Sequence, residues 1–339
     1  MKNYCIFELA ALAALTFASC SSESVEDLGG NQASQQVAIG FDGYLGRSAV
    51  DTRGKISDLT AIQAENVGFG VFGNYTASDE TTPTYGQNLF VNQPVTYSSA
   101  ETKWTYSPVK YWPTEGHIDF LAYAPYDKAQ KKLIDNKNLV FMVNSDVTKQ
   151  IDLLWANAAN QTKASGKVNF TFNHALAKIG YSVKSKGNYD QTTITVKSIK
   201  LVGSENENTK AFYTKGVIDL SKANGADALW KTVSADTKQN FTLLSSAQTL
   251  NTKYEPTDYL FVIPQNFSAP ENKLYVVVEY TVKTGETAEL ENKVSKPITK
   301  DFQQGKAYMI NLIIGLTPIE FEATVESWGP DTNEDIELN

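Results

Sequence analysis

The sequence is poor in the residues that most often carry out catalysis or bind metal ions. Its 339 residues include two cysteines and two histidines. Both cysteines, Cys5 and Cys20, lie in the first twenty residues, so the rest of the chain forms no disulfide and offers no thiol nucleophile or cysteine ligand for zinc. No nucleophile elbow, phosphate loop or dinucleotide fingerprint is present either. We therefore expect neither an enzyme nor a protein that binds a cofactor.

The histidines and the acidic residues add no site. His117 and His174 fall in different expected domains, and we expect His174 to satisfy a hydrogen bond at a strand end instead of acting as a base. The segment Asp331–Asp335, "DTNED", spaces its oxygen ligands as a calcium loop does, but Ile336 stands where such a loop has glycine. We expect a solvated acidic tail there and no metal. The net charge of −8 also excludes a basic surface for a nucleic-acid backbone.

Arginine is equally scarce and is confined to one place. Arg47 and Arg53 are the only arginines of the chain, and both lie in the polar segment 43–58, "GYLGRSAVDTRGKISD". All other basic side chains, apart from the histidines, are lysines. Chance or a local ion pair would also produce such a cluster, so the clustering by itself does not indicate a function.

The first twenty residues are typical of a bacterial export signal. Lys2 precedes an apolar run, Leu9–Phe17, which is too short to span a bilayer but has the length of a signal-peptide core. The run leads into "FASC", which ends at Cys20 and resembles a lipoprotein box. We expect residues 1–20 to be a lipoprotein signal peptide with Cys20 as the lipidated residue, and residues 21–35 to be a flexible tether. The alternative is an ordinary signal peptide that happens to contain Cys20.

The pattern of residues in the remainder of the chain predicts β-strands. Tyrosine, phenylalanine, valine and threonine are abundant, and apolar residues alternate with polar ones between closely spaced turn signals. The first predicted strand spans residues 37–45 and places Val37, Ile39 and Phe41 on one face. A hairpin turn is predicted at residues 283–286.

This pattern indicates an all-β protein with two domains. The polar stretch "NQTKASGK", residues 160–167, separates two series of predicted strands. We therefore expect two tandem β-sandwich domains of the transthyretin-like or Greek-key kind, over residues 36–165 and 166–339.

An aromatic run at residues 103–113, "KWTYSPVKYWP", is the best candidate for a ligand contact. Trp104 and Tyr106 fall on one strand face, and Trp112 follows closely. Exposed rings would stack on sugars, which makes a glycan site one interpretation. Aromatic residues at a period of two more often belong to the core of a sandwich, which is the other interpretation.

Four segments together resemble one protein family. They are "VKYWPTEGHIDFLAYAPY", "VNFTFNHALAKIGYSV", "FQQGKAYMINLII" and "ATVESW", in that order along the chain. Their order and spacing are similar to those of the fimbrillin-like proteins, the pilin-type (type V) lipoproteins of Bacteroidales-type Gram-negative anaerobes. With the lipoprotein signal, the resemblance covers nearly the whole chain.

The resemblance implies a use for the arginines. In that family an N-terminal strand completes the first sandwich, an arginine-specific protease cuts the loop after it, and a strand from a neighbouring subunit fills the opened groove. Carried to this sequence, the removable strand is 37–45, with Val37, Ile39 and Phe41 as its plugs. Arg53 is the preferred cleavage site and Arg47 the second choice.

The expected role is that of a fimbrial subunit, with other subunits, an arginine-specific protease and the outer membrane as partners. Ile319, Phe321, Ala323 and Val325 alternate cleanly, but we expect them in the subunit's own core. Beyond Trp328 the sole apolar pair is Ile336 and Leu338, a weak donor strand, which favours a tip, accessory or minor subunit that moves from the outer membrane to the fimbrium. The alternative is that the tail rearranges together with the preceding strand, and the sequence does not decide between the two.

The alternative is an outer-membrane glycan-binding lipoprotein that never polymerises and uses Trp104, Tyr106 and Trp112. The two readings differ in what they require of these rings. The first predicts them buried and the second predicts them exposed. Which host or bacterial surface glycan or protein the chain would bind is not specified by the sequence.

Overall fold

The computed structural model shows a protein made mostly of β-strands. The residues that it describes are 36–45, 59–65, 67–78, 87–130, 132–223, 229–233, 237–250, 259–269, 271–318 and 321–327. Helical structure among them is limited to α1 (Leu59–Gln63) and two 3-10 turns, η1 (Val147–Lys149) and η2 (Lys163–Ser165). None of these described helices is long and apolar enough to cross a membrane. The expected all-β class is confirmed, while the division into two tandem sandwiches stays a prediction.

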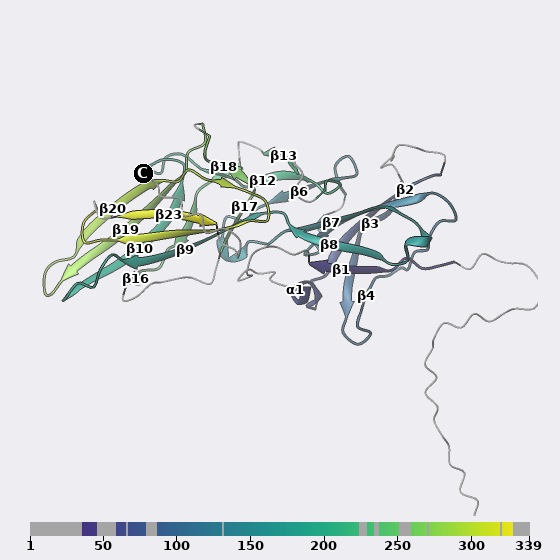
Figure 1. Cartoon of the computed structure of the whole chain (residues 1–339), viewed down its shortest axis with the longest axis horizontal. Coiled ribbons are helices and arrows are strands. Elements are labelled where there is room, and N and C mark those ends of the chain that lie inside the picture. The colour runs from purple at the N-terminus through teal and green to yellow at the C-terminus, as the bar shows by residue number, and fades with distance from the viewer. Residues whose placement is uncertain are drawn as a thin grey trace, which may run out of the picture. The chain divides into compact units, whose positions relative to one another are not determined.

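The first half of the chain builds a seven-stranded sheet in the order β1-β8-β7-β5-β2-β3-β4. Its strands are β1 (Phe41–Leu45), β2 (Phe69–Thr76), β3 (Gln87–Ser98), β4 (Lys103–Thr105), β5 (His117–Ala124), β7 (Leu154–Gln161) and β8 (Val168–His174). β1 pairs with β8 in parallel, and all other neighbours in this sheet are antiparallel. Figure 1 shows β1 beside β8.

The two ends of this sheet nearly meet. The residues ahead of β1 bond to the segment after β4, where the Ile39 amide donates to the Lys110 carbonyl at 2.8 Å and the Trp112 amide donates to the Val37 carbonyl at 3.0 Å. The sheet therefore curls into a nearly closed barrel, which leaves little free edge.

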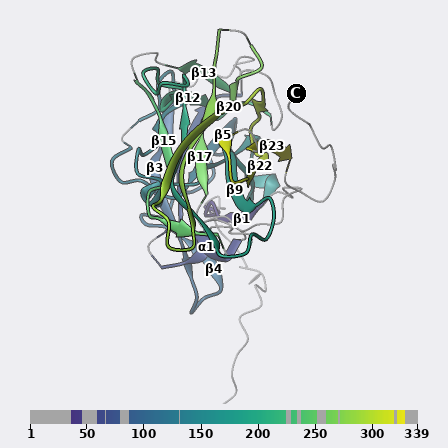
Figure 2. The ribbon, with the colours of Figure 1, turned by 90° about the vertical axis from the view of Figure 1, so that its left-hand side faces the viewer.

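The second half builds further sheets, seen in Figure 1 and from another side in Figure 2. A five-stranded sheet has the order β15-β10-β19-β20 with β16 beside β10, a four-stranded sheet has the order β17-β9-β22-β23, and a three-stranded sheet has the order β13-β12-β6. Two small pairs, β11-β14 and β18-β21, complete the described strands. The bounds are β6 (Asn138–Met142), β9 (Ala177–Ser185), β10 (Thr192–Val202), β11 (Phe212–Tyr213), β12 (Lys215–Asp219), β13 (Trp230–Val233), β14 (Lys238–Gln239), β15 (Phe241–Leu244), β16 (Gln248–Thr249), β17 (Leu260–Val262), β18 (Gln265–Asn266), β19 (Tyr275–Thr284), β20 (Leu290–Pro297), β21 (Asp301–Phe302), β22 (Ala307–Ile314) and β23 (Glu322–Ser327).

A turn is present where the sequence predicted one, but it spans residues 284–287, one residue later than the predicted 283–286. It joins β19 to β20, which pair in antiparallel register as far as Val282 opposite Leu290. Gly285 has a φ of 55°, a left-handed conformation that glycine adopts without steric cost. The Thr287 amide donates to the Thr284 carbonyl at 3.1 Å and closes the turn.

Two hydrophobic clusters lie on opposite faces of the seven-stranded sheet. The cluster inside the barrel, here called the barrel core, consists of Ile39, Phe41, Ile62, Phe69, Val71, Phe90, Val95, Trp104, Trp112, Ile118, Phe120, Ala122, Ala124, Leu154, Ala156, Val168, Phe170 and Phe172. The other, here called the outer core, takes Phe72, Leu121, Tyr123 and Trp155 from the same strands and joins them to residues of β9, β10, β12, β17, β19 and β22. Strand β5 shows the alternation, because Phe120 belongs to the barrel core and Leu121 to the outer core.

The outer core is shared by the two halves of the chain. β6, from the first half, pairs with β12, from the second, over the register Lys215 opposite Met142 to Asp219 opposite Asn138. β8 follows the predicted boundary at residue 166 yet pairs with β7 and β1. The boundary itself stays a prediction.

Replacing Trp155 tests the shared core. Trp155 is 1% exposed on the outer face of β7, so Trp155→Ala should lower the free energy of unfolding by about 3–5 kcal/mol. Because the outer core joins both halves, urea unfolding followed by far-UV circular dichroism should remain a single transition at a lower midpoint. Two separate transitions, or a loss no larger than that of the exposed control Val91→Ala, would contradict this assignment.

Candidate functional site: the first-strand segment and its groove

The candidate site is the first-strand segment, residues 37–45, and the groove in which it lies. One wall of the groove is β8, with Phe41 opposite Val168 and Leu45 opposite Phe172. The other wall is residues 110–112, which bond to the backbone of residues 37–39. The segment is thus held by main-chain hydrogen bonds on both sides, as an internal strand would be.

The side chains that enter the groove are partly those predicted. Ile39 is 2% exposed and Phe41 is 3% exposed, as the alternation predicted. Val37 is 39% exposed, so its expected role as a third plug is not supported. Regular pairing with β8 begins only at Phe41, and Val37 lies four residues ahead of it. The third inward position is instead occupied by Gly43, which is buried.

Phe41 is the main contact of the segment with the barrel core. Its ring centroid lies 5.5 Å from that of Phe90, 5.5 Å from that of Phe120, 5.8 Å from that of Phe170 and 5.3 Å from that of Tyr106. The contacts with Phe90 and Phe120 are edge-to-face, a favoured aromatic geometry. Four rings from four different parts of the chain therefore meet on one side chain.

Tyr106 fixes the backbone of the segment. Its hydroxyl donates to the Ile39 carbonyl at 2.8 Å and accepts from the Lys110 amide at 3.2 Å. Burial raises the pKa of Tyr106 above its usual value. The Lys110 ammonium donates to the Leu89 carbonyl at 2.6 Å and so ties this wall to β3. Sequence reasoning did not identify Lys110, because nothing in its local pattern marks a bond to a distant strand.

The outward face of the segment makes weaker contacts. Asp42 forms an ion pair with Lys167, with the Oδ2 and Nζ atoms 3.3 Å apart. The Lys167 side chain is 61% exposed, so this pair contributes little to stability. Tyr44 is 53% exposed. The inward face therefore carries most of the binding energy of the segment.

The three aromatic candidates line or flank the groove. Trp104 is 8% exposed and packs against Phe69, with ring centroids 4.8 Å apart. Trp112 is 6% exposed and packs edge-on against Phe120 at 6.1 Å. Stacking on a sugar requires an exposed ring face, which this arrangement does not give to either indole. The packing fits the interpretation of the run as core.

The lipidation and cleavage candidates lie outside the described residues. These are Cys20, Arg47 and Arg53. The acidic segment Asp331–Asp335 and Trp328 also lie outside the described residues. The last described residue before the arginines is Leu45, and description resumes at Leu59. Their roles stay predictions.

The histidines hold structural positions. His174 ends β8, and its Nδ1 lies 3.1 Å from Oδ1 of the buried Asp152, which confirms the predicted hydrogen bond at a strand end. His117 Nε2 lies 3.9 Å from Oδ2 of Asp119. Within the described ranges no group of three or more histidine, cysteine, aspartate or glutamate side chains is arranged to hold a metal ion.

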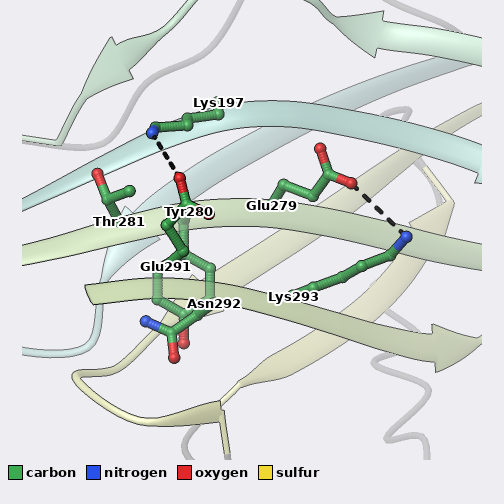
Figure 3. A pocket seen from close by; sticks show the side chains of 7 residues that line it. All are labelled: Lys197, Glu279, Tyr280, Thr281, Glu291, Asn292 and Lys293. Carbon is green, nitrogen blue, oxygen red and sulfur yellow. Dashed lines mark hydrogen bonds and ion pairs between the residues drawn. The ribbon is translucent and has the colours of Figure 1, made fainter. Parts of the chain in front are cut away.

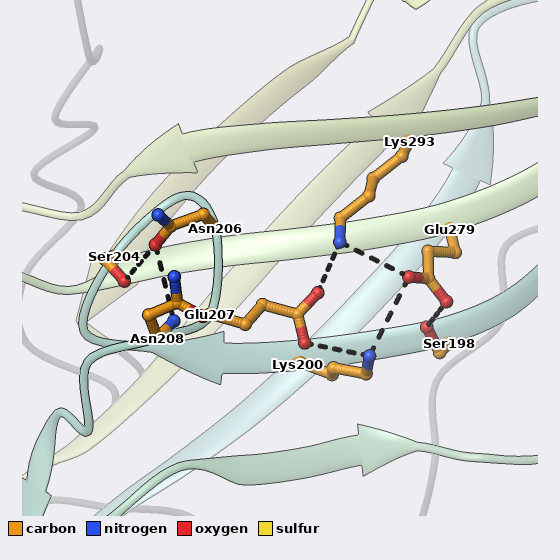
Figure 4. A network of polar contacts seen from close by, with 8 residues as sticks. All are labelled: Ser198, Lys200, Ser204, Asn206, Glu207, Asn208, Glu279 and Lys293. Carbon is orange, nitrogen blue, oxygen red and sulfur yellow. Dashed lines mark hydrogen bonds and ion pairs between the residues drawn. The ribbon is translucent and has the colours of Figure 1, made fainter.

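A polar hollow on the five-stranded sheet is another place where charged groups gather. It is lined by Lys197, Glu279, Tyr280, Thr281, Glu291, Asn292 and Lys293 (Figure 3). Beside it, Lys293 and Lys200 lie 2.5 Å and 2.9 Å from the carboxylate of Glu207 (Figure 4). These ammonium groups, Lys293 foremost, hold the pKa of Glu207 below its usual value. The charges compensate one another, and the residues that line the hollow include no histidine or cysteine, so a structural ion-pair network explains them.

Truncating the central plug tests the site. Because Phe41 is buried among four rings, Phe41→Ala should lower the free energy of unfolding by about 3–5 kcal/mol. The matched control on the outward face of the same strand, Tyr44→Ala, should change it by less than about 0.5 kcal/mol. Both values come from urea unfolding curves. Equal losses for the two variants would show that the first-strand segment does not contribute to the barrel core as described.

Tyr106 gives a prediction in alkaline solution. Since its pKa is raised in the folded state, its contribution is complete below the usual pKa of 10.0 and declines as the pH rises from there towards the raised value. Tyr106→Phe should cost about 0.5–1.5 kcal/mol at neutral pH by removing the bond to the Ile39 carbonyl. The variant should also lose less stability than the parent as the pH rises above 10.0. Unfolding curves across that range, with Tyr44→Phe as control, measure the free energy of unfolding as a function of pH. If Tyr106→Phe leaves this pH dependence unchanged, the described role of the Tyr106 hydroxyl is wrong.

Comparison with known proteins places the chain in a family. Residues 52–328 match the family model described as Fimbrillin-like, and no curated protein matches. A solved fimbrial protein from Bacteroides vulgatus is 22% identical with a TM-score of 0.63, over 86% of this chain and 99% of that one. A candidate cell adhesion protein from Bacteroides uniformis is 18% identical with a TM-score of 0.50, over 88% and 100%. These structures share the fold, and the family model covers most of the sequence. The chain belongs to the fimbrillin-like family, as its four motifs predicted.

Proposed function

We propose that this chain is a fimbrial subunit that is exported as a lipoprotein precursor, cut after an arginine and assembled by β-strand exchange. Membership of the fimbrillin-like family supports the coarser part, a fimbrial or cell adhesion protein of the cell surface and not an enzyme. The observation that carries the finer part is the position of the first-strand segment. It is an end strand whose side chains fill the barrel core, and both arginines follow it directly in the sequence.

Removal of the segment would create the conditions for exchange. The amides and carbonyls of β8 that pair with β1 would lose their partners, and an unpaired edge of this kind recruits another strand. The sites of Ile39 and Phe41 would open to water at the same time. Their burial is worth ~1.5–3 kcal/mol each, so an incoming strand must supply a similar gain to be retained.

The position within a fimbrium and the attachment to the membrane are also part of the proposal. Cys20 would carry the lipid that holds the precursor at the outer membrane, and Arg53, with Arg47 as second choice, would be cut by an arginine-specific protease. Phe321, Ala323 and Val325 are 3%, 6% and 3% exposed, so these three side chains lie in the subunit's own core, while Ile319 lies outside the described residues. That placement supports a tip, accessory or minor subunit with a role in adhesion.

The N-terminus and intact mass of the protein recovered from its native cell surface test the proposal. A chain that begins at Gly54 or Ser48 would support cleavage at Arg53 or Arg47. A chain that still begins at a lipidated Cys20 would contradict it. The control is Arg47→Lys with Arg53→Lys, which keeps both charges but removes the arginine side chains, and this variant should remain uncut.

A further inference from the structure

We infer that the groove selects its occupant by a pattern in which glycine or alanine stands two residues after an aromatic residue. The full pattern is aliphatic, any, aromatic, any, glycine or alanine, any, aliphatic, as in Ile39 to Leu45. This inference rests on the proposed strand exchange and specifies the partner: an extended segment of a neighbouring subunit that carries this pattern. Three features of the groove lead to it.

The first feature is the crowding around Gly43. A Cβ atom added there would lie 3.4 Å from Cε2 of Phe172, 3.6 Å from Cε1 of Phe69 and 3.7 Å from Nε1 of Trp104. Those are ordinary van der Waals distances, so a methyl group fits. Any longer side chain would have to enter space filled by three rings. Phe69 packs against both of the others, with centroids 4.8 Å and 5.2 Å away, so the rings cannot yield separately.

The second feature is the aromatic site two residues earlier. Phe90, Phe120, Phe170 and Tyr106 surround the ring of Phe41 at 5.3–5.8 Å between centroids. An aliphatic side chain in this position would leave a cavity and lose the edge-to-face contacts. The two sites therefore differ sharply in size although they are neighbours on one strand face.

The third feature holds the backbone of the occupant in place, so that the size of the small site decides its register. The Tyr106 hydroxyl bonds to the carbonyl of residue 39, and the Trp112 amide bonds to the carbonyl of residue 37. These bonds involve the backbone of the occupant and so do not depend on its sequence. A strand shifted by two residues towards Gly43 would place its aromatic ring in the small site, which the three rings exclude.

The outward positions of the segment place fewer restrictions on the side chains of an occupant. Tyr44 is 53% exposed, and a Cβ atom at Gly40 would meet only the flexible side chain of Lys167, at 3.3 Å. Lys167 also pairs with Asp42, so an acidic residue is accommodated just after the aromatic one, although this exposed pair contributes little. The groove thus selects the inward positions by size and leaves the outward positions largely unrestricted.

A second segment of this chain carries the same pattern. Residues 319–325, "IEFEATV", align with residues 39–45, "IGFDGYL", so that Phe321 falls at the position of Phe41 and Ala323 at that of Gly43. Glu322 then falls at the position of Asp42, facing Lys167. Its own strand, β23, is an end strand that pairs only with β22 among the described strands. A peptide of this sequence is therefore a suitable probe of the groove.

Peptide exchange tests the inference on the full chain. An arginine-specific protease cuts in vitro after Arg47 and Arg53, which leaves the first-strand segment held without a covalent link. Fluorescent peptides of residues 36–47 and 317–327 are then added, and binding is followed by anisotropy. Both should bind. Gly43→Leu in the first peptide and Ala323→Leu in the second should weaken binding about ten- to hundredfold. Gly43→Ala and Tyr44→Leu should stay within about threefold.

The outcomes separate this inference from the proposed function. Equal binding of the Gly43→Leu peptide, or no binding of the 317–327 peptide, would overturn the pattern even if native processing at the arginines is found. Conversely, an uncut native chain would contradict the proposed function, while the peptide result would still test which side chains the groove accepts. If the cut chain does not release its segment, Gly43→Leu and Gly43→Ala in the intact chain replace the peptides. Only Gly43→Leu should then lower the urea midpoint, and equal midpoints would overturn the inference.

Discussion

The barrel depends on one aromatic side chain supplied by an end strand. Phe41 contacts rings from β3, β5, β8 and the segment after β4. The backbone around it closes the sheet by bonding to β8 on one side and to residues 110–112 on the other. Taking the first-strand segment away would therefore remove the filling of the core and the closure of the sheet at once. The contacts that stabilise the segment are thus the same contacts that an incoming strand would have to replace in the proposed exchange.

The topology makes such removal feasible. Antiparallel neighbours are often joined by hairpins, whereas β1 lies parallel to a strand that follows it by more than a hundred residues. No tight turn ties the segment to either wall of its groove. A cut in the sequence between β1 and α1 would leave the other described strands of the seven-stranded sheet joined in one chain. An end strand with this connectivity meets the requirement of the proposed exchange, that the rest of the sheet stays connected.

Short-range pattern predicted the strands and the inward direction of Ile39 and Phe41, because side chains alternate along any strand that covers a core. It failed at Val37, where the chain has left the regular pairing, and it could not give Gly43 a role, because a glycine shows no apolar pattern. The contribution of Lys110 and the pairing of β6 with β12 were also beyond reach, since both depend on which distant strands become neighbours. The motifs in family order supplied what the periodicity could not: the expectation of an exchangeable first strand.

The separation of the two cores explains how an opened groove could keep its shape. The seven-stranded sheet divides the barrel core from the outer core, and β5 contributes alternate residues to each. Loss of Ile39 and Phe41 would deplete the barrel core alone. The outer core, which includes Tyr123, Trp155 and strands from the second half of the chain, would still hold the outer face of the sheet. A wall fixed from behind keeps the small and large sites in register, and a preformed groove of this kind binds its strand without the cost of ordering it anew.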